Sequence, residues 1–390
     1  MKHIKYGVLP RSSQSERIKY RNVNFDLQNL GVSLQRCSDS YSEGGITLSK
    51  EYKSAAIIGL GGQGRSHNTA YMGLSNVKVI AACEVSEEQL SAFIDENSDV
   101  RGYTDAKDLF ENEDIDIVSI VTNTPSHRDL TVAAVKSGVQ AVLCEKPMAH
   151  SPAAARQMID ICAEHNVRLA INHMRRWSPR YHKLREMLED SLIGEIGNLI
   201  YVSGGALFAC IATHIFDLMR MLTEREIISI SGRFDAFRRP NFRGTQYHDP
   251  GGHALALFDG DTRAFIDLSE NLGVPGWFDI HGSLGRVHIE EERGIWQVMA
   301  RQGNDREQPP WASRNTLQPV DFSTGGENWT AVLQVGIVEL LGGGEIMSSG
   351  EDGYAALEAI VAAHISHEND GAPVALPLTG DDLSREFTFT

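Results

Sequence analysis

The chain has 390 residues, 42% of them hydrophobic and 23% charged, which is the composition of an ordinary soluble globular protein with room for two domains. Its 52 acidic residues outnumber 36 basic ones and give a formal net charge of −16, which argues against non-specific binding to nucleic acid or to an anionic membrane. No apolar run approaches the roughly 20 residues of a membrane span and no secretory signal is visible, so with five scattered cysteines we expect a cytoplasmic protein with reduced thiols.

The first segment, residues 1–53, is polar and has no sustained periodicity. It precedes the first apolar run, so we predict an N-terminal extension. Two interpretations are open: a disordered leader, or an arm that packs on the surface of the protein itself or of a partner. The sequence assigns no function to this segment.

Residues 54–172 alternate short apolar runs with helical stretches, which is typical of a parallel sheet with crossover helices. The expected strands cover residues 55–58, 77–83, 115–121, 141–144 and 168–171. Helices are expected at 130–136 and 153–165. We therefore predict an NAD-binding Rossmann domain over 54–172, with its ligand beyond the carboxyl ends of the strands.

The glycines after the first expected strand indicate the dinucleotide-binding turn of that domain. Gly59, Gly61 and Gly64 form the pattern G-x-G-x-x-G, and Glu84 follows at the end of the next apolar run. Gly59 permits the tight turn, Gly61 lets the backbone approach a pyrophosphate, and Gly64 lets the helix pack on the strand. Glu84 accepts hydrogen bonds from an adenosine ribose and repels a 2′-phosphate. We therefore expect NAD as the cofactor, with NADP less favoured.

From residue 173 the pattern changes to strand-like runs with helical stretches at 179–189, 212–222, 328–341 and 354–367. The strand-like runs cover 198–203, 227–232, 253–258, 264–268, 277–282 and 286–290. Asp259-Gly260 between two of these runs is a hairpin signal, and strands joined by hairpins form an antiparallel sheet. We predict an α/β domain over 173–390 with a large, mostly antiparallel open sheet, and a loop over 300–326.

Four segments, taken in order, resemble the Gfo/Idh/MocA family, which includes glucose–fructose oxidoreductases and inositol dehydrogenases. They are IIGLGGQG, EKPMAHSPAAARQM, HMRRWSPRY with IGEIGN after it, and THIFDLMRML. The closing stretch SSGEDGYAALEAIVAAHISHENDGAPVALPL is similar to the usual end of that family. The resemblance covers residues 54 to about 380 and implies NAD(P)-dependent redox chemistry at a hydroxyl-bearing carbon of a sugar or cyclitol. It also implies a C-terminal sheet that often mediates oligomerisation, so we expect a homo-dimer or homo-tetramer.

The resemblance further implies site residues. The Lys of the family's Glu-Lys-Pro motif reaches the reacting hydroxyl and the nicotinamide, which carries over onto Lys146, and an acid/base His on a helix of the second domain carries over onto His214. The expected cofactor contacts are Gly59, Gly61, Gly62, Gln63, Gly64, Glu84, Asn123, Thr124, Pro125, His127, Glu145 and Lys146. The expected substrate contacts are His173, Arg176, Cys210 and Asp217.

The residue types suit these roles, because a hydride leaves carbon as a proton leaves oxygen. An imidazole titrates near pH ~6.5 and suits His214 as the proton acceptor, whereas the ammonium of Lys146 stabilises developing alkoxide charge. In relatives an Asp commonly stands four residues before this His, and here that position is Cys210. Cys210 and His214 alone lack a third ligand for zinc, so we expect no metal.

Other interpretations stay open for two of these residues. Asp217 is either a substrate contact or a salt-bridge partner of Arg220. Arg176 either binds a carboxylate or phosphate or clamps the domain interface.

The sequence therefore favours an NAD-dependent oxidoreductase that acts on a sugar, cyclitol or related derivative. One alternative is an NAD-dependent lyase or hydrolase that oxidises its substrate transiently so that a substituent can be eliminated. The other is a catalytically weak NAD-binding module, which the Asp-to-Cys departure at residue 210 makes worth testing.

Overall fold

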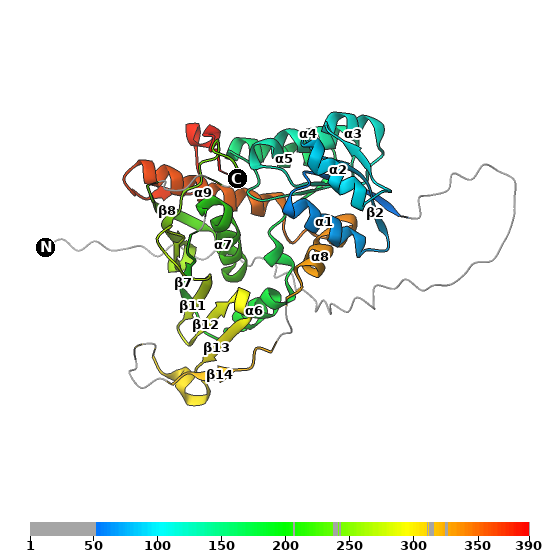
Figure 1. The fold of residues 1–390 in the computed structure, drawn as a ribbon. Coiled ribbons are helices and arrows are strands. Elements are labelled where there is room, and N and C mark those ends of the chain that lie inside the picture. Colours follow the sequence, from blue (N-terminus) through cyan, green and yellow to red (C-terminus); the bar gives the residue numbers. More distant parts are fainter. Residues whose placement is uncertain are drawn as a thin grey trace, which may run out of the picture. The chain divides into compact units, whose positions relative to one another are not determined.

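The computed structural model describes residues 52–205, 207–236, 241, 243–309, 311, 316–323 and 327–389 (Figure 1). The expected N-terminal extension lies outside these residues except for Tyr52 and Lys53. Part of the expected loop over 300–326 also lies outside them.

The first sheet has six parallel strands in the order β3-β2-β1-β4-β5-β6. Its strands are β1 (Lys53–Ile58), β2 (Val77–Cys83), β3 (Arg101–Tyr103), β4 (Ile117–Ile120), β5 (Ala141–Cys144) and β6 (Arg168–Ile171). This is the strand order of a doubly wound dinucleotide-binding fold, and it confirms the predicted parallel sheet. β3 was not predicted, because this short edge strand has no buried apolar run.

Five helices connect these strands, and they cover both faces of the sheet, so the central strands are buried. The helices are α1 (Gly62–Met72), α2 (Glu87–Glu96), α3 (Ala106–Asn112), α4 (His127–Ser137) and α5 (Pro152–Glu164). Side chains fix several of the helix starts: Ser86, Asp105 and Ser151 each accept a hydrogen bond from a backbone N–H in the first turn.

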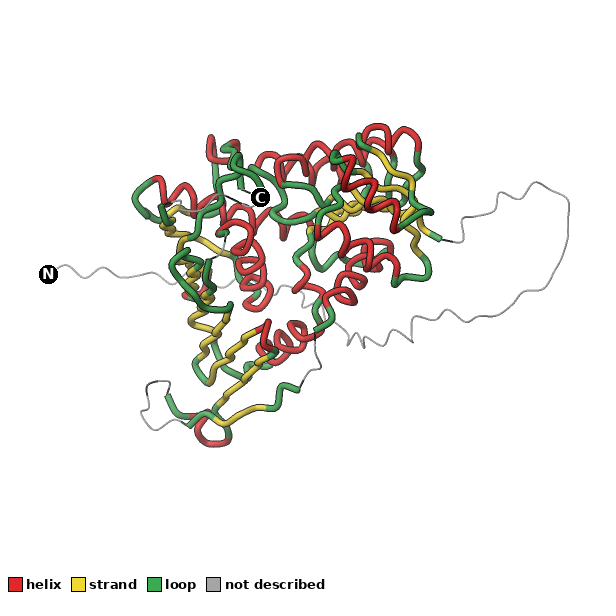
Figure 2. Tube along the Cα trace, in the orientation of Figure 1, coloured by secondary structure: helices red, strands yellow, loops and turns green. Residues whose placement is uncertain are grey.

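Among the described residues, the second sheet has nine strands in the order β14-β13-β12-β11-β7-β10-β9-β8-β15, and only its β7–β10 pair is parallel. Its strands are β7 (Ile196–Val202), β8 (Ile227–Phe234), β9 (Gly252–Phe258), β10 (Arg263–Asp267), β11 (Trp277–Gly282), β12 (Gly285–Glu290), β13 (Ile295–Ala300), β14 (Gln318–Val320) and β15 (Val374–Ala375). Figure 2 draws the strands of both sheets in yellow. The predicted mostly antiparallel sheet and its hairpin at Asp259-Gly260 are confirmed. The prediction of a loop throughout 300–326 is wrong at β14, a three-residue edge strand that contains Pro319 and lacks an apolar run.

In the described residues after β6, four α-helices form: α6 (Pro179–Glu189), α7 (Phe208–Thr223), α8 (Trp329–Leu341) and α9 (Gly350–Glu368). α7 buries apolar side chains, with Ile215, Leu218 and Leu222 at most 3% exposed, while Ile211 in its first turn is partly buried. α9 packs on β8 and α7 but also on α5 and β6, and α8 packs on α1 and β5. The last helices therefore contact the first sheet, and a domain boundary at residue 172 stays a prediction.

Among the described residues, no helix combines the length and the apolarity needed to cross a bilayer. The four described cysteines are free thiols, as expected. The cytoplasmic location stays a prediction.

Candidate functional site

The glycine turn after β1 has the local geometry that the sequence predicts. Gly59 has φ +94°, a left-handed conformation that favours glycine, and a Cβ at Gly64 would lie 2.0 Å from the Gly59 carbonyl oxygen. The turn and packing roles of these two glycines are therefore confirmed. In contrast, a Cβ at Gly61 or Gly62 would meet no described atom within 4 Å. No side chain caps the N-terminus of α1 at Gly61, so the open side of the turn presents backbone N–H groups, with Gln63 in the first helical turn.

Glu84 stands at the carboxyl end of β2, beside this turn. Its Oε2 accepts a hydrogen bond from the backbone N–H of Leu60 at 2.9 Å, and its Oε1 accepts one from Ser86 N at 3.1 Å. Two backbone donors thus hold the carboxylate at the strand end. Each oxygen keeps further acceptor capacity, which is what a ribose diol requires.

The residues expected after β4 divide into two kinds. Asn123 precedes a short 3-10 turn at Thr124–Ser126 that includes Pro125, at the carboxyl edge of the sheet. His127 instead is fully buried, with Nε2 2.9 Å from Thr122 O and Nδ1 3.1 Å from Pro147 O. Burial lowers the pKa of His127 despite these carbonyls, which act to raise it. This ring therefore joins the ends of β4 and β5 and supports the turn around Pro147.

Glu145, the first residue of the Glu-Lys-Pro motif, is held in a buried polar network. Its Oε1 accepts from Asn172 Nδ2 at 2.6 Å and lies 3.2 Å from His67 Nε2, while His67 Nδ1 lies 3.0 Å from Ser119 Oγ. Burial acts to raise the pKa of Glu145, but the hydrogen bond and charge of His67, the charge of Lys146 and the Asn172 amide lower it to about 2. Sequence reasoning missed His67; its only signal was a polar residue on the buried face of α1.

Lys146 extends from the end of β5 to the first turn of α7. Its Nζ lies 3.2 Å from the carbonyl oxygen of Cys210 and 3.3 Å from Cys210 Sγ. The backbone N–H of Cys210 in turn donates to Asp249 Oδ2 at 3.0 Å. The structure thus brings two predicted site residues, Lys146 and Cys210, into contact and adds a third residue, Asp249, that the sequence analysis did not single out.

His214 follows one helical turn after Cys210 on α7 and is half-buried. Burial, and then the charges of Lys146 and Arg175, hold its pKa well below the usual value, so the ring is neutral at neutral pH and one of its nitrogens is a proton acceptor. The ring of His173 lies beside it, with centroids 5.7 Å apart in an edge-to-face arrangement. His173 is itself 1% exposed, and its Nε2 lies 3.0 Å from Thr213 Oγ1. This buried contact helps to hold α7 against the segment after β6.

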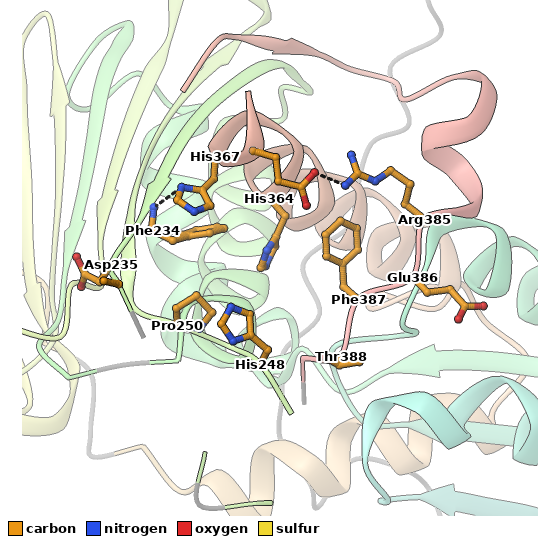
Figure 3. A pocket seen from close by; sticks show the side chains of 12 residues that line it. Phe234, Asp235, His248, Pro250, His364, His367, Arg385, Glu386, Phe387 and Thr388 are labelled. Atoms are coloured by element: carbon orange, nitrogen blue, oxygen red, sulfur yellow. Dashed lines mark hydrogen bonds and ion pairs between the residues drawn. The ribbon is translucent and has the colours of Figure 1, made fainter. Parts of the chain in front are cut away.

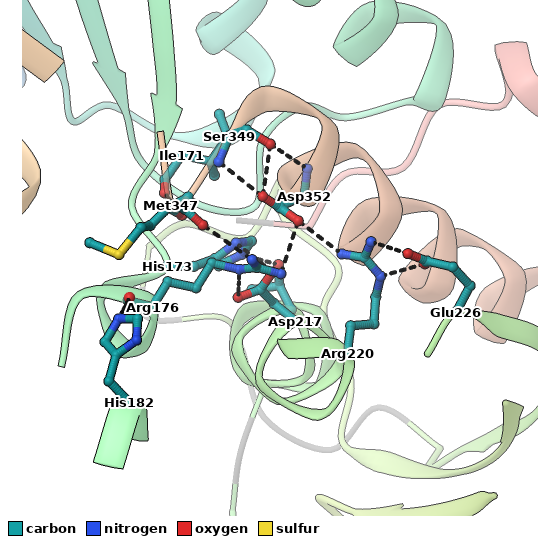
Figure 4. A network of polar contacts seen from close by, with 12 residues as sticks. Ile171, His173, Arg176, His182, Asp217, Arg220, Glu226, Met347, Ser349 and Asp352 are labelled. Atoms are coloured by element: carbon teal, nitrogen blue, oxygen red, sulfur yellow. Dashed lines mark hydrogen bonds and ion pairs between the residues drawn. The ribbon is translucent and has the colours of Figure 1, made fainter. Parts of the chain in front are cut away.

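Arg176 and Asp217 form a buried ion pair that continues into α9 (Figure 4). Arg176 Nε donates to both Asp217 oxygens at 2.8 and 2.9 Å, and its Nη2 lies 2.9 Å from Asp352 Oδ1. Burial acts to raise the pKa of Asp352, but Arg176, Ser349 and Arg220 keep it below the usual value.

The ion pair between Asp217 and Arg220, one of the two interpretations left open for Asp217, does not form among the described contacts. Arg220 pairs instead with Glu226 at 2.7 Å and Asp352 at 3.4 Å, because Asp217 faces the segment after β6 while Arg220 faces α9 and β8 (Figure 4). For Arg176 the contacts favour the clamp over the substrate contact, since its guanidinium joins the segment after β6 to α7 and α9.

A cavity of about 510 Å³ lies elsewhere, where the ends of β8 and α9 meet the last residues of the chain (Figure 3). It is lined by Phe234, Asp235, Ala236, His248, Pro250, His364, His367, Glu368, Arg385, Glu386, Phe387 and Thr388. None of the predicted site residues lines this cavity, but two of its lining residues, His248 and Pro250, flank Asp249.

The strand order and the glycine turn together define a dinucleotide-binding protein with a second, open sheet. Residues 53–173 match a family model described as "Oxidoreductase family, NAD-binding Rossmann fold". This match covers less than a third of the chain, and over residues 53–173 the chain is similar to the Gfo/Idh/MocA oxidoreductases, as the motifs of that segment predict.

Two curated relatives show the range of similarity. A D-apiose dehydrogenase from Paraburkholderia graminis is 34% identical over 148 residues, which cover 38% of this chain and 39% of that protein. An inositol 2-dehydrogenase from Rhizobium meliloti is 24% identical over 322 residues, which cover 79% of this chain and 94% of the relative. The stronger identity is thus confined to a part of both chains, whereas the weaker one spans nearly the whole relative.

Among solved structures, an oxidoreductase from Agrobacterium radiobacter, in complex with NAD⁺, L-tartaric acid and magnesium, superposes with a TM-score of 0.68. It is 21% identical, and the match covers 83% of this chain and 98% of that one. At this identity the likeness establishes the fold alone. The fold covers both sheets, so the predicted architecture is confirmed beyond the first domain.

Proposed function

We propose that the chain is an NAD-dependent oxidoreductase that transfers a hydride between the nicotinamide and a hydroxyl-bearing carbon of a sugar, cyclitol or related derivative. One observation carries the proposal: Lys146, at the carboxyl end of a Rossmann strand, contacts the first turn of the helix that bears His214. This contact supports the proposal that the cofactor-binding sheet and the acid/base candidate serve the same site. The names of the curated relatives, D-apiose dehydrogenase and inositol 2-dehydrogenase, support the substrate class.

The residues around the glycine turn fit the cofactor. The open space at Gly61 and Gly62 and the uncapped N-terminus of α1 suit a pyrophosphate, and Glu84 suits the adenosine ribose. When bound there, NAD⁺ supplies the hydride acceptor. The protein's task is then to orient the substrate carbinol and to manage its proton.

Two side chains perform that task in the proposed mechanism. His214 accepts the hydroxyl proton, because its neutral ring has a free acceptor at neutral pH. Lys146 stabilises the negative charge that develops on the substrate oxygen, and its contacts with Cys210 fix the direction of its side chain.

A substrate panel tests the proposal. Sugars, cyclitols and sugar acids are supplied with NAD⁺, and NADH absorbance is recorded. Net NADH formation on at least one polyol is the expected result. Turnover without net NADH supports instead the lyase or hydrolase mechanism, and NAD binding without turnover on any compound supports the weakly catalytic binding module.

The cofactor preference depends on the charge of Glu84. The variant Glu84→Gln keeps an oxygen acceptor beside Leu60 but removes the carboxylate that repels a 2′-phosphate. We expect the ratio of kcat/KM for NAD⁺ to that for NADP⁺ to fall by about 10-fold. An unchanged ratio would show that another part of the site excludes NADP⁺. Glu87→Gln, a change of equal charge on the first turn of α2, is the matched control.

We also propose that the outer face of the second sheet joins two copies of the chain. Ile228 on β8 and Leu255 and Leu257 on β9 are 44–46% exposed, a row of apolar side chains on paired strands. We expect Leu255→Lys with Leu257→Lys to shift the sedimenting species toward the monomer. Met72→Lys, at a residue 74% exposed at the end of α1, should leave the oligomeric state unchanged. A monomeric wild type would remove this proposal.

A further inference from the structure

A buried carboxylate lies beside the site on a segment that the sequence motifs do not include. Asp249 precedes β9 and is 1% exposed. Its Oδ1 accepts a hydrogen bond from Ala209 N at 2.7 Å, and its Oδ2 accepts one from Cys210 N at 3.0 Å. Both donors belong to the first turn of α7, whose N-terminal end has no side-chain cap from Leu207.

Cys210 connects this carboxylate to Lys146. On one side the backbone N–H of Cys210 is held by Asp249, and on the other its carbonyl oxygen and Sγ hold Lys146 Nζ at 3.2 and 3.3 Å. A shift of Asp249 would therefore move Cys210, whose carbonyl oxygen and Sγ accept hydrogen bonds from Lys146 Nζ. His214 lies one turn further along the same helix.

The charges around Asp249 match this arrangement. Two cations face it, Lys146 from the segment after β5 and Arg243 from the segment before β9, and both favour its ionised form. The Nη1 atom of Arg243 lies 3.7 Å from Cys210 Sγ, so the thiol at the start of α7 faces the same cluster. Asp249 is thus the carboxylate of a small group of charges centred on residue 210.

We propose that Asp249 is a positioning residue for the reaction: from the segment before β9 it supplies the carboxylate that α7 lacks at residue 210, and through Cys210 it fixes Lys146. The inference rests on the proposed function. The carboxylate of Asp249 thus reaches the first turn of α7 from another segment of the chain.

The titration of Asp249 gives the proposal a signature. Burial raises the pKa of Asp249 to about 7, although the two backbone N–H groups, Lys146 and Arg243 act to lower it. Below that pH the carboxyl group takes up a proton, so one of its two oxygens no longer accepts its backbone hydrogen bond as well. The neutral group also no longer balances the charge of Lys146. We therefore expect wild-type kcat/KM to fall as the pH decreases through about 7. His214 titrates far lower, so its own acid limb lies apart from this one.

The experiment compares four proteins: wild type, Asp249→Asn, the double variant Cys210→Asp with Asp249→Asn, and the control Asp259→Asn. Asp259 also accepts a backbone N–H, from Glu226, but lies on the exposed β9–β10 hairpin. The pH dependence of kcat/KM, NAD affinity by calorimetry and the carboxyl ¹³C shifts of aspartate-labelled protein are measured. Lys146→Ala, measured alongside, reports on the proposed function itself.

We expect Asp249→Asn to lose about 100-fold in kcat/KM at pH ~8, to lose the limb near neutral pH, and to bind NAD as wild type does. The double variant should recover at least about 10-fold of that loss, because it returns a carboxylate to the first turn of α7. In wild type, a carboxyl resonance that titrates near neutral pH and is absent from Asp249→Asn completes the expected result.

Several results overturn the inference. One is an Asp249→Asn variant that keeps the wild-type pH profile and merely melts earlier, since Asp249 is then only a helix cap. Another is the absence of any limb near neutral pH in wild type, which decides the matter even where Asp249→Asn does not fold. The inference alone is contradicted if wild type is active, Lys146→Ala is inactive and Asp249→Asn is unaffected, because the proposed function is then still supported. A wild type without turnover on any polyol sinks the proposed function as well.

Discussion

Replacing Lys146 or His214 by alanine is expected to lower kcat by about 100- to 1,000-fold while changing the dissociation constant of NAD by less than about threefold. The reason is that each side chain acts on the substrate oxygen: Lys146 stabilises its charge and His214 accepts its proton. Neither side chain belongs to the glycine turn or to the ribose contact at Glu84. Steady-state rates on the best polyol, together with calorimetric titration of NAD, measure the two effects separately.

The control for the first of these variants is Lys107→Ala. Lys107 is an exposed lysine on α3 whose ion pair with Glu111 is solvent-exposed, so its removal should leave kcat and NAD affinity unchanged. A Lys146→Ala protein that turns over at the wild-type rate would contradict the proposed mechanism. So would a large loss of NAD affinity at unchanged kcat, since Lys146 would then serve the cofactor alone.

Most of the fold could be predicted because buried strands and helices need apolar residues, which form recognisable patterns in the sequence. β5 lies inside the first sheet with all four of its residues buried, so it reads as a continuous apolar run. β2 contains Lys78 and the edge strand β6 begins with Arg168, but the remaining residues of both are apolar, and all three strands were predicted at their observed bounds. β3, β14 and β15 were missed because each has only two or three residues and lies at a sheet edge. β13 was also missed, although it has six residues and lies between β12 and β14. Turn chemistry predicted the β9–β10 hairpin.

The candidate site could be predicted only where a local motif carries it. The glycine turn and the Glu-Lys-Pro segment are short patterns, and the structure brings Lys146 to Cys210 from 64 residues away. Side-chain partners do not follow from helical spacing alone. Arg220 stands one turn from Asp217 on α7, yet Asp217 pairs with Arg176. The reason is that the segment after β6 packs on the face of α7 that carries Asp217, and it brings the guanidinium of Arg176 there.

Asp249 shows the same limit more strongly. It lies 39 residues beyond Cys210, in a segment without periodicity, and only the folded chain places it against α7. His67 likewise reaches Glu145 from 78 residues away, through the buried face of α1. Polar contacts between residues this far apart in the sequence follow no fixed spacing, so the sequence does not predict them. They nevertheless hold the motif residues in place.

The ion pair of Arg176 with Asp217 gives the second large expected effect, and it concerns stability. Asp217→Ala should lower the free energy of unfolding by about 3–5 kcal/mol, because it leaves Arg176 in a buried position with Asp352 as its remaining charged partner among the described residues. Urea unfolding measures the loss. Glu226→Gln, at the exposed end of the same network, should cost less than about 1 kcal/mol.

A further double variant separates the clamp from a substrate contact. Arg176→Met with Asp217→Leu removes both charges together, and Asp352 then keeps its partners Arg220 and Ser349, so part of the lost stability should return. If Arg176 and Asp217 clamp three elements, KM on the best polyol stays near the wild-type value at temperatures where the variants are folded. A stable Asp217→Ala protein with a strongly raised KM would reverse the assignment and return both residues to the substrate, because only a ligand contact lowers affinity without lowering stability.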